Sequence, residues 1–282
     1  MAVDYEKEYD NRARVPEHPQ IFARWDAEAK AYRDACQGAQ IGLKYGSSPR
    51  QTIDLFPGKD AGAAAPLAMF IHGGWWRALS PVSFSQMAKG LNESGIDVAV
   101  VGYDLCPTVS IATITEQMRA ACLNLWHTHQ KRITVYGHSA GGHLTACMVA
   151  TDWRSLEPSA PANLVPAGYA ISGVFDLSPL TQVSMNKDLQ LDDAEAQRVS
   201  PLHWNVPQGS ILDAAVGGIE SNEFLRQSKT IAEEWGKRGA QTRYVPIEGA
   251  NHFTVLDPLT DAGSAMTKRI AELARHTAAM DR

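Results

Sequence analysis

The sequence lacks the features that mark several common classes of protein. Its 282 residues include four cysteines, which are far apart and form neither a CxxC pair nor a zinc-ligand spacing: Cys36, Cys106, Cys122 and Cys147. We therefore expect free, mostly buried thiols and no disulfide framework. No apolar run approaches the roughly 18 residues that a membrane span requires, so a membrane partner is not expected.

Signals for nucleic acid, cofactors and secretion are also sparse. The formal net charge is −5, and no block of Lys and Arg provides an electrostatic footprint for nucleic acid. No G-x-G-x-x-G motif follows the first predicted strand, so a dinucleotide is not expected, and neither is any other cofactor. The first nine residues are charged and lack the apolar stretch of a secretory signal, which favours a cytoplasmic location.

What the sequence does contain is an alternation of short strands and longer helices. The predicted strands are residues 52–56, 67–71, 98–103, 133–136, 168–171, 211–216 and 242–246. The predicted helices are residues 81–93, 114–129, 140–150, 223–238 and 261–279. This alternation indicates right-handed crossovers, hence an α/β fold with a central, mostly parallel sheet of about eight strands and helices on both faces. We expect one domain over residues 1–282.

Two segments depart from this rhythm. Residues 1–40 contain no strand pattern, and Phe22, Trp25, Ala29 and Tyr32 recur on one face at helical spacing. This N-terminal helical segment either covers part of the core or forms a partial cap over an active site. Residues 173–206 are long, polar and rich in Ser, Asp and Pro, and excursions of this kind are usually functional.

The strongest motif is the run Ile133-Thr-Val-Tyr-Gly-His-Ser-Ala-Gly-Gly-His143, where a predicted strand turns sharply into a predicted helix. It contains the G-x-S-x-G pattern of a nucleophile elbow in the strand–turn–helix setting that this motif requires. Glycines flank the serine because the tight turn leaves no room for a Cβ. The helix N-terminus favours negative charge that develops beside the hydroxyl. The pattern therefore predicts Ser139 as a nucleophile.

A second motif predicts groups that would stabilise an oxyanion. The apolar strand Leu67-Ala-Met-Phe-Ile runs into His72-Gly-Gly-Trp-Trp76, the position from which such enzymes donate backbone N–H groups. We expect an oxyanion hole formed by the N–H groups of Gly73, Gly74 and Ala140. The neighbouring residues expected to contact the substrate are Trp75, Trp76, His138 and Phe253.

A nucleophilic serine needs a base, and in this fold the chain order is serine, acid, histidine. Among the nine histidines, only His203 and His252 lie after Ser139 and outside the elbow and the last predicted helix. His252 is favoured because it follows a predicted strand after a short loop, whereas His203 lies in the polar excursion. The pairs His127/His129 and His138/His143 have no acidic or thiol companion, so no metal site is expected.

The acid is expected directly after the predicted strand 211–216. Glu220 occupies that position, from which its carboxylate would fix the tautomer of His252. Two alternatives stay open. Asp176 follows another strand, and Glu223 is expected to open the next helix, where acidic side chains favour the helix dipole.

With these residues in hand, the chain resembles the arylformamidase (kynurenine formamidase) branch of the α/β hydrolases over nearly its full length. The segments that carry the resemblance are Tyr9-Asp-Asn-Arg-Ala-Arg-Val-Pro, His72-Gly-Gly-Trp-Trp, Tyr103-Asp-Leu-Cys-Pro, Gly137-His-Ser-Ala-Gly-Gly-His, Glu220-Ser-Asn-Glu-Phe-Leu-Arg-Gln-Ser and Asn251-His252. The family's acid falls on Glu220, where the animal formamidases carry Asp.

The motifs and the resemblance together imply a serine hydrolase that cleaves small carboxylic esters or N-formyl aryl amides through an acyl-enzyme. Its partner would be a small-molecule ester or formamide. Two alternatives remain: an acyltransferase that uses the same triad, and a catalytically inactive binding protein. The sequence decides neither the natural substrate nor whether the chain forms a homodimer.

Overall fold

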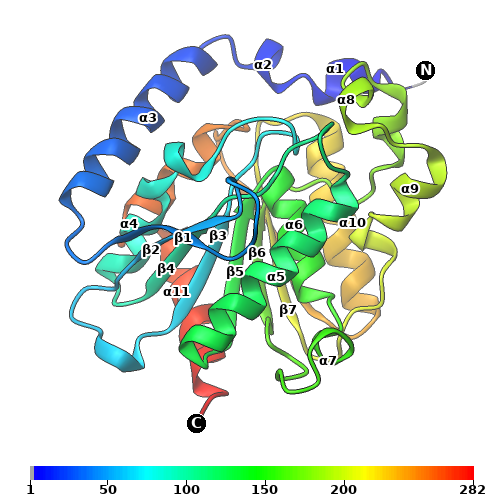
Figure 1. Ribbon diagram of the computed structural model, residues 1–282. Helices are drawn as coiled ribbons and strands as arrows, with labels where there is room; N and C mark the ends of the chain where they lie inside the picture. Colours follow the sequence, from blue (N-terminus) through cyan, green and yellow to red (C-terminus); the bar gives the residue numbers. More distant parts are fainter. Residues whose placement is uncertain (1–2) are drawn as a thin grey trace.

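A computed structural model describes residues 3–282 and contains one eight-stranded sheet in the order β1-β2-β4-β3-β5-β6-β7-β8 (Figure 1). The strands are β1 (Gln40–Lys44), β2 (Thr52–Phe56), β3 (Leu67–Ile71), β4 (Asp97–Val101), β5 (Ile133–His138), β6 (Ala167–Ile171), β7 (Ile211–Gly217) and β8 (Gln241–Ile247). The pairs β1–β2 and β2–β4 are antiparallel, and the other neighbouring strands are parallel. The predicted α/β fold with a mostly parallel sheet is therefore confirmed.

Helices cover both faces of this sheet. The α-helices are α1 (Tyr5–Tyr9), α2 (Asn11–Arg14), α3 (His18–Ala35), α4 (Lys89–Glu93), α5 (Ile111–His129), α6 (Ala140–Val149), α7 (Trp153–Leu156), α8 (Asn186–Leu189), α9 (Asp193–Arg198), α10 (Asn222–Lys237) and α11 (Ala265–Ala279). Side chains of α5, α6 and α10 share one buried apolar cluster, and those of α3, α4 and α11 share a second one. Each cluster packs on one face, so the central strands are buried on both sides.

The strand that the sequence did not predict is β1, at the edge of the sheet. All five of its residues are exposed, so the pattern of buried apolar residues that reveals the other strands is missing. Its register with β2 is also irregular between Gln40 and Leu43. Only its backbone pairing with β2 defines this strand, and the local sequence gives no sign of that pairing.

Two predicted helices are shorter than the sequence indicates. In the segment predicted as 81–93, Phe84 has φ −129°, outside the helical range, and the chain forms two 3₁₀ turns before α4 begins. The ring of Phe84 packs against Trp25 and Phe70. The last helix begins at Ala265 because Ser264 caps it by accepting a hydrogen bond from the N–H of Thr267 at 3.0 Å.

The cysteines are free and mostly buried, as the sequence predicts. All four cysteines are free, three are buried, and Cys36 is partly exposed. Among residues 3–282, none of the helices combines the length and the apolar character that crossing a membrane would need.

The arrangement of the strands positions the functional groups. The loops that follow parallel strands meet at one edge of the sheet, where ligands of open α/β sheets usually bind. The chain of α1, α2 and α3 passes over this edge, beside α8 of the excursion 173–206 (Figure 1). Residues from the N-terminal helices and from the strand ends therefore line one shared cavity.

Candidate active site

Ser139 occupies a strained turn between β5 and α6. Its backbone angles are φ 55° and ψ −116°, which residues with a Cβ rarely adopt. Two backbone hydrogen bonds hold it there: its N–H donates to the carbonyl of Ile171 at 2.8 Å, and its carbonyl accepts from the N–H of His143 at 3.1 Å. The serine is thus held rigidly at the carboxyl end of a central strand.

Gly137 and Gly141 flank Ser139 because the neighbouring backbone leaves no room for a side chain at either position. A Cβ on Gly141 would lie 1.9 Å from the carbonyl oxygen of Ile71, and one on Gly137 would lie 2.4 Å from the carbonyl oxygen of Gly141. Such contacts are far below van der Waals distance, so α6 can press against β3 only without side chains here. The spacing of the motif follows from this close packing.

A buried hydrogen bond joins His252, which follows β8, to Glu220, which follows β7. The His252 Nδ1 lies 2.6 Å from the Glu220 Oε2, and the two side chains are 5% and 0% exposed. The second carboxylate oxygen accepts from the N–H of Gly217 at 2.7 Å and from the Ser172 hydroxyl at 2.5 Å. Because Nδ1 donates to the carboxylate, the Nε2 of a neutral His252 ring is left as an acceptor.

The rival acids and the rival histidine are engaged elsewhere. The carboxylate of Asp176 accepts from the N–H of Ser178 at 3.0 Å. The carboxylate of Glu223 accepts from the Tyr9 hydroxyl at 3.2 Å and pairs with an arginine of its own helix. His203 is exposed and is not among the residues that line the cavity. Of the three candidate carboxylates, Glu220 is the one that forms a hydrogen bond with His252.

His138 fixes the loop that carries His252. Its Nε2 donates to the carbonyl of His252 at 2.7 Å. Burial and the nearby His252 ring hold the pKa of His138 well below its usual value, so the ring stays neutral. On another side, Phe224 lies 4.5 Å from the His252 ring, measured between centroids. The orientation of His252 is therefore set by packing as well as by Glu220.

The glycines after β3 lie against Ser139. A Cβ on Gly73 would be 3.1 Å from the Cβ of Ser139, and Gly74 has φ 114°, a conformation that favours glycine. Across the described chain, the backbone N–H groups of Gly73, Gly74 and Ala140 find no hydrogen-bond acceptor. Three free donors thus belong to the backbone segments that meet at the serine.

A buried stack of the His72 and Tyr103 rings packs beside the loop that carries Gly73 and Gly74. The His72 ring lies 4.3 Å from that of Tyr103, nearly parallel, and the Tyr103 hydroxyl donates to the His72 carbonyl at 2.8 Å. Burial lowers the pKa of His72 to about 4, so this ring carries no charge near neutral pH. His72 therefore serves the loop as a packed, neutral ring.

Ser139 and His252 line a cavity of about 440 Å³. The remaining lining residues come from the N-terminal segment, the chain after β3, the end of β5, the excursion and the loop after β8: Glu6, Tyr9, Asp10, Asn11, Arg12, Phe22, Trp25, Gly74, Trp75, Arg77, Ala78, Leu79, Phe84, His138, Ser184, Met185, Asp188 and Phe253. The sequence indicated a functional role for residues 173–206 and offered a cap as one reading of residues 1–40, but it did not single out Asn11, Arg12 or the lining residues of the excursion. Asn11 and Arg12 also lie in the N-terminal block that carries the family resemblance.

The two tryptophans after the glycines separate. Trp75 lines the cavity and packs edge-on against Tyr9, with 5.7 Å between ring centroids. Trp76 is fully buried and packs edge-on against His143 at 5.0 Å, away from the cavity. The expectation that Trp76 contacts the substrate is therefore corrected, whereas Trp75, His138 and Phe253 do lie on the cavity wall.

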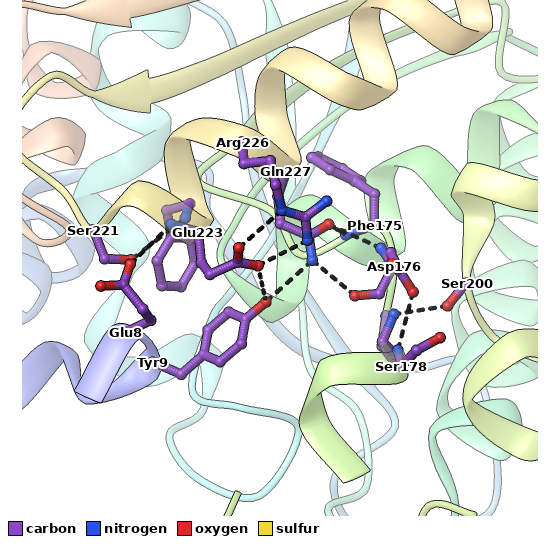
Figure 2. A network of polar contacts seen from close by, with 12 residues as sticks. Glu8, Tyr9, Phe175, Asp176, Ser178, Ser200, Ser221, Glu223, Arg226 and Gln227 are labelled. Carbon is purple, nitrogen blue, oxygen red and sulfur yellow. Dashed lines mark hydrogen bonds and ion pairs between the residues drawn. The ribbon is translucent and has the colours of Figure 1, made fainter. Parts of the chain in front are cut away.

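A buried polar network ties the N-terminal helices to α10 (Figure 2). The Tyr9 hydroxyl donates to Glu223 at 3.2 Å and accepts from the Gln227 amide at 3.1 Å. Burial raises the pKa of Tyr9, so this hydroxyl stays protonated. Glu8 adds a further link by accepting from the N–H of Glu223 at 3.0 Å. The side chains that wall the cavity on this side are thus fixed to the body of the protein.

Within residues 3–282, no group of three or more His, Cys, Asp and Glu side chains could hold a metal ion.

Comparison with known proteins identifies related chains. A family model described as the alpha/beta hydrolase fold matches residues 68–256. The kynurenine formamidase of Danio rerio is 26% identical over 238 residues, which is 82% of this chain and 80% of the fish protein. That of Drosophila melanogaster is 27% identical over 227 residues, or 76% of this chain and 75% of the fly protein.

A solved structure is similar over almost the whole chain. It is a crystal structure from Silicibacter sp. TM1040 whose description as a thioesterase is provisional. The TM-score is 0.85 at 32% sequence identity, over 95% of this chain and 99% of that one.

The network in Figure 2 leads to a prediction on stability. Tyr9→Phe removes the donor to the buried Glu223 and the acceptor of Gln227, so we expect the free energy of unfolding to fall by about 1–3 kcal/mol. Urea denaturation followed by circular dichroism measures the change. Tyr5→Phe is the matched control, because the Tyr5 hydroxyl makes no hydrogen bond within residues 3–282. Equal stability of the two variants would contradict the role of the network.

Proposed function

Because the chain belongs to the α/β-hydrolase fold family, we propose that it is a serine hydrolase that cleaves small carboxylic esters or N-formyl aryl amides. Ser139 is the nucleophile, His252 the general base and Glu220 the acid that orients the base. The observation that carries this proposal is the buried 2.6 Å hydrogen bond that His252 donates to Glu220, because the His252 ring shares a cavity with the strained Ser139.

The reaction proceeds through an acyl-enzyme. The Nε2 of His252 takes the proton of the Ser139 hydroxyl while the oxygen attacks the carbonyl carbon of the substrate. The tetrahedral intermediate collapses, and the imidazolium gives its proton to the leaving group. Water then enters, loses a proton to His252 and attacks the acyl-enzyme. The second intermediate collapses to release the carboxylic acid, and His252 returns the proton to the oxygen of Ser139.

The oxyanion of each intermediate is bound by backbone N–H groups of Gly73, Gly74 and Ala140. Their lack of acceptors within the described chain supports this role. Such donors are aligned before the reaction and need no reorganisation, and losing one typically costs about 3–4 kcal/mol of transition-state stabilisation.

The surroundings of Glu220 support its role as the acid. Its carboxylate accepts from Gly217, Ser172 and His252, so both of its oxygens are satisfied without water. A carboxylate held in this way fixes the ring orientation of His252 and stabilises the imidazolium when it forms. It needs no proton of its own in this cycle.

The relatives and the cavity wall support small acyl groups on aryl leaving groups. The curated relatives named above are kynurenine formamidases. The rings of Trp75, Phe22 and Phe253 line the cavity and offer stacking surfaces for a planar group. We propose that residues 1–40 form a partial cap on the same catalytic domain, because seven of the lining residues lie between Glu6 and Trp25.

Replacement of the nucleophile tests the proposal. Ser139→Ala is expected to lower kcat by a factor on the order of 10⁴–10⁶ while the fold is retained, because no other group can form the acyl-enzyme. Hydrolysis of 4-nitrophenyl acetate and of N-formylaniline measures the effect. Ser47→Ala, the same change at an exposed serine, is the control. A folded Ser139→Ala protein that keeps a tenth of the original activity would contradict the assignment of Ser139 as the nucleophile.

The choice of acid has its own test. Glu220→Gln keeps the shape of the side chain but favours the wrong tautomer of His252, so we expect kcat to fall by up to about 10⁴. Asp176→Asn makes the same chemical change at a carboxylate that has no contact with His252 and should leave kcat nearly unchanged. The opposite ranking in folded proteins would show that the wrong carboxylate has been chosen.

The cavity wall predicts a preference in acyl length. Trp75 follows the oxyanion glycines and limits the space beside the scissile carbonyl. The enzyme should therefore prefer short acyl groups, from formyl up to butyryl, over longer ones. Trp75→Gly removes this volume, and glycine suits the local φ of 53°. The ratio of kcat/KM for octanoate to that for acetate esters should therefore rise in the variant. An unmutated enzyme that prefers octanoate would contradict this account.

A further inference from the structure

The loop that carries the oxyanion-hole glycines is strained over three consecutive residues. Gly74, Trp75 and Trp76 have φ angles of 114°, 53° and 54°, all in the left-handed region. Residues with a Cβ disfavour this region, and bulky side chains are rare there. The N–H of Arg77 closes the turn by donating to the carbonyl of Gly74 at 3.1 Å. Such a backbone persists only where its surroundings hold it in place.

Backbone packing holds this loop at its start. β3 ends at Ile71, and α6 presses through Gly141 on the carbonyls of Ile71 and His72. Across the described chain, the N–H groups of Gly73 and Gly74 donate to no backbone acceptor. The strained turn that follows therefore needs an anchor at its far end.

Trp76 provides that anchor. Its side chain is fully buried in the apolar cluster shared by α5, α6 and α10. Its carbonyl accepts from the N–H of Cys106 at 2.8 Å. The indole Nε1 has no hydrogen-bond partner within residues 3–282, so packing alone positions the ring. Trp76 thus fixes the end of the turn through its backbone carbonyl and through the shape of its side chain.

The Trp76 ring meets α6 at His143. The ring centroids are 5.0 Å apart and the planes lie at 88°, an edge-on arrangement that aromatic rings favour. His143 is fully buried, and its Nε2 donates to the carbonyl of Val199 in the excursion at 2.7 Å. The backbone N–H of His143 donates to the carbonyl of Ser139 at 3.1 Å. The ring that contacts Trp76 therefore belongs to the same helical turn as the proposed nucleophile.

The contact between Trp76 and His143 bridges the two segments that supply the proposed oxyanion donors. One segment carries Gly73 and Gly74, and the other is the first turn of α6, which begins with Ala140. The spacing of these donors decides whether they reach one oxygen together, and a misplacement of about 1 Å can cost roughly 100-fold in rate.

We propose that Trp76 and His143 are positioning residues whose packing sets the spacing between the two halves of the oxyanion hole. This inference rests on the proposed function, because the donors act on the oxyanion of that reaction. It gives the buried Trp76 a role in the reaction without contact to the substrate.

A pair of matched variants tests the proposal. Trp76→Phe shortens the ring that reaches His143. Trp153→Phe makes the same change at a tryptophan of the same cluster that is 1% exposed, has an unpaired Nε1 and does not line the cavity. We expect both variants to lose stability. Only Trp76→Phe should lower kcat for 4-nitrophenyl acetate, on the order of 10- to 100-fold at similar KM, because oxyanion donors act mainly in the transition state.

The split between kcat and KM separates positioning from other roles. Equal kcat values for the two variants would overturn the proposal, because loss of core packing would then explain both. A higher KM at unchanged kcat would overturn it as well, since that result marks a lost substrate contact. The Ki of an aryl trifluoromethyl ketone, whose serine adduct carries an oxyanion, should rise in Trp76→Phe by about the factor by which kcat/KM falls. An unchanged Ki would contradict the proposal.

A double-mutant cycle tests whether the two residues act together. His143→Gln removes the ring but keeps an N–H that can donate to Val199. The double variant with Trp76→Phe should lose about as much kcat as the more harmful single change, because both changes break the same contact. Trp76→Phe combined with Trp153→Phe should show independent effects. Effects of Trp76→Phe and His143→Gln that multiply in full would overturn the pairing.

Hydrogen exchange examines the loop without relying on catalysis. The amides of Arg77 and Cys106 donate to the carbonyls of Gly74 and Trp76, which belong to the loop. Both amides should exchange faster in Trp76→Phe, and Trp153→Phe should leave them unchanged. Unchanged exchange in Trp76→Phe would overturn the inference and leave the serine hydrolase standing. If the native protein hydrolyses neither esters nor formamides but the amides respond as expected, the proposed function fails and the anchoring of the loop stands.

Discussion

The site depends on one buried hydrogen bond, that between Glu220 and His252. It joins the loops after β7 and β8, so it can form only because these two strands are parallel neighbours over their full length. Ser172, just after β6, and Gly217, at the end of β7, hold the second carboxylate oxygen. Three consecutive strands of the sheet therefore fix the orientation of a single imidazole. A fully buried carboxylate costs much free energy unless it is paired in this way, so the pairing and the fold stabilise each other.

At Ser139, the constraint is the close packing of the surrounding backbone. Ser139 adopts a backbone conformation that costs on the order of 1–3 kcal/mol, and such strain persists only where the surroundings enforce it. The surroundings here are α6 pressed against β3 through Gly141, and Gly73 pressed against Ser139. The same close approach brings the free N–H groups of both segments to the serine. Strain, glycine spacing and unpaired donors are thus three consequences of one contact between α6 and the loop after β3.

The sequence predicts those parts of the architecture that depend on local residue patterns. Buried parallel strands are continuous apolar runs, and the elbow has a fixed spacing, so most strands and Ser139 could be recognised. The exposed strand β1 has no such signal. Nothing local distinguishes Trp75, which lines the cavity, from its neighbour Trp76, which is buried in the core. The wall from residues 6 to 25 depends on contacts such as that of Tyr9 with Glu223, which are 214 positions apart in the chain. No local pattern reports a contact of that range.

Covalent labelling tests the central claim most directly, that Ser139 is the nucleophile activated by His252. The protein would be treated with a fluorophosphonate, digested with trypsin and analysed by mass spectrometry. In the tryptic peptide of residues 133–154, Ser139 is the only serine, so an adduct on its hydroxyl can be assigned without ambiguity. The account predicts a single adduct at Ser139 that is lost in a folded His252→Ala variant. An adduct at another residue, or none on the folded native protein, would contradict it.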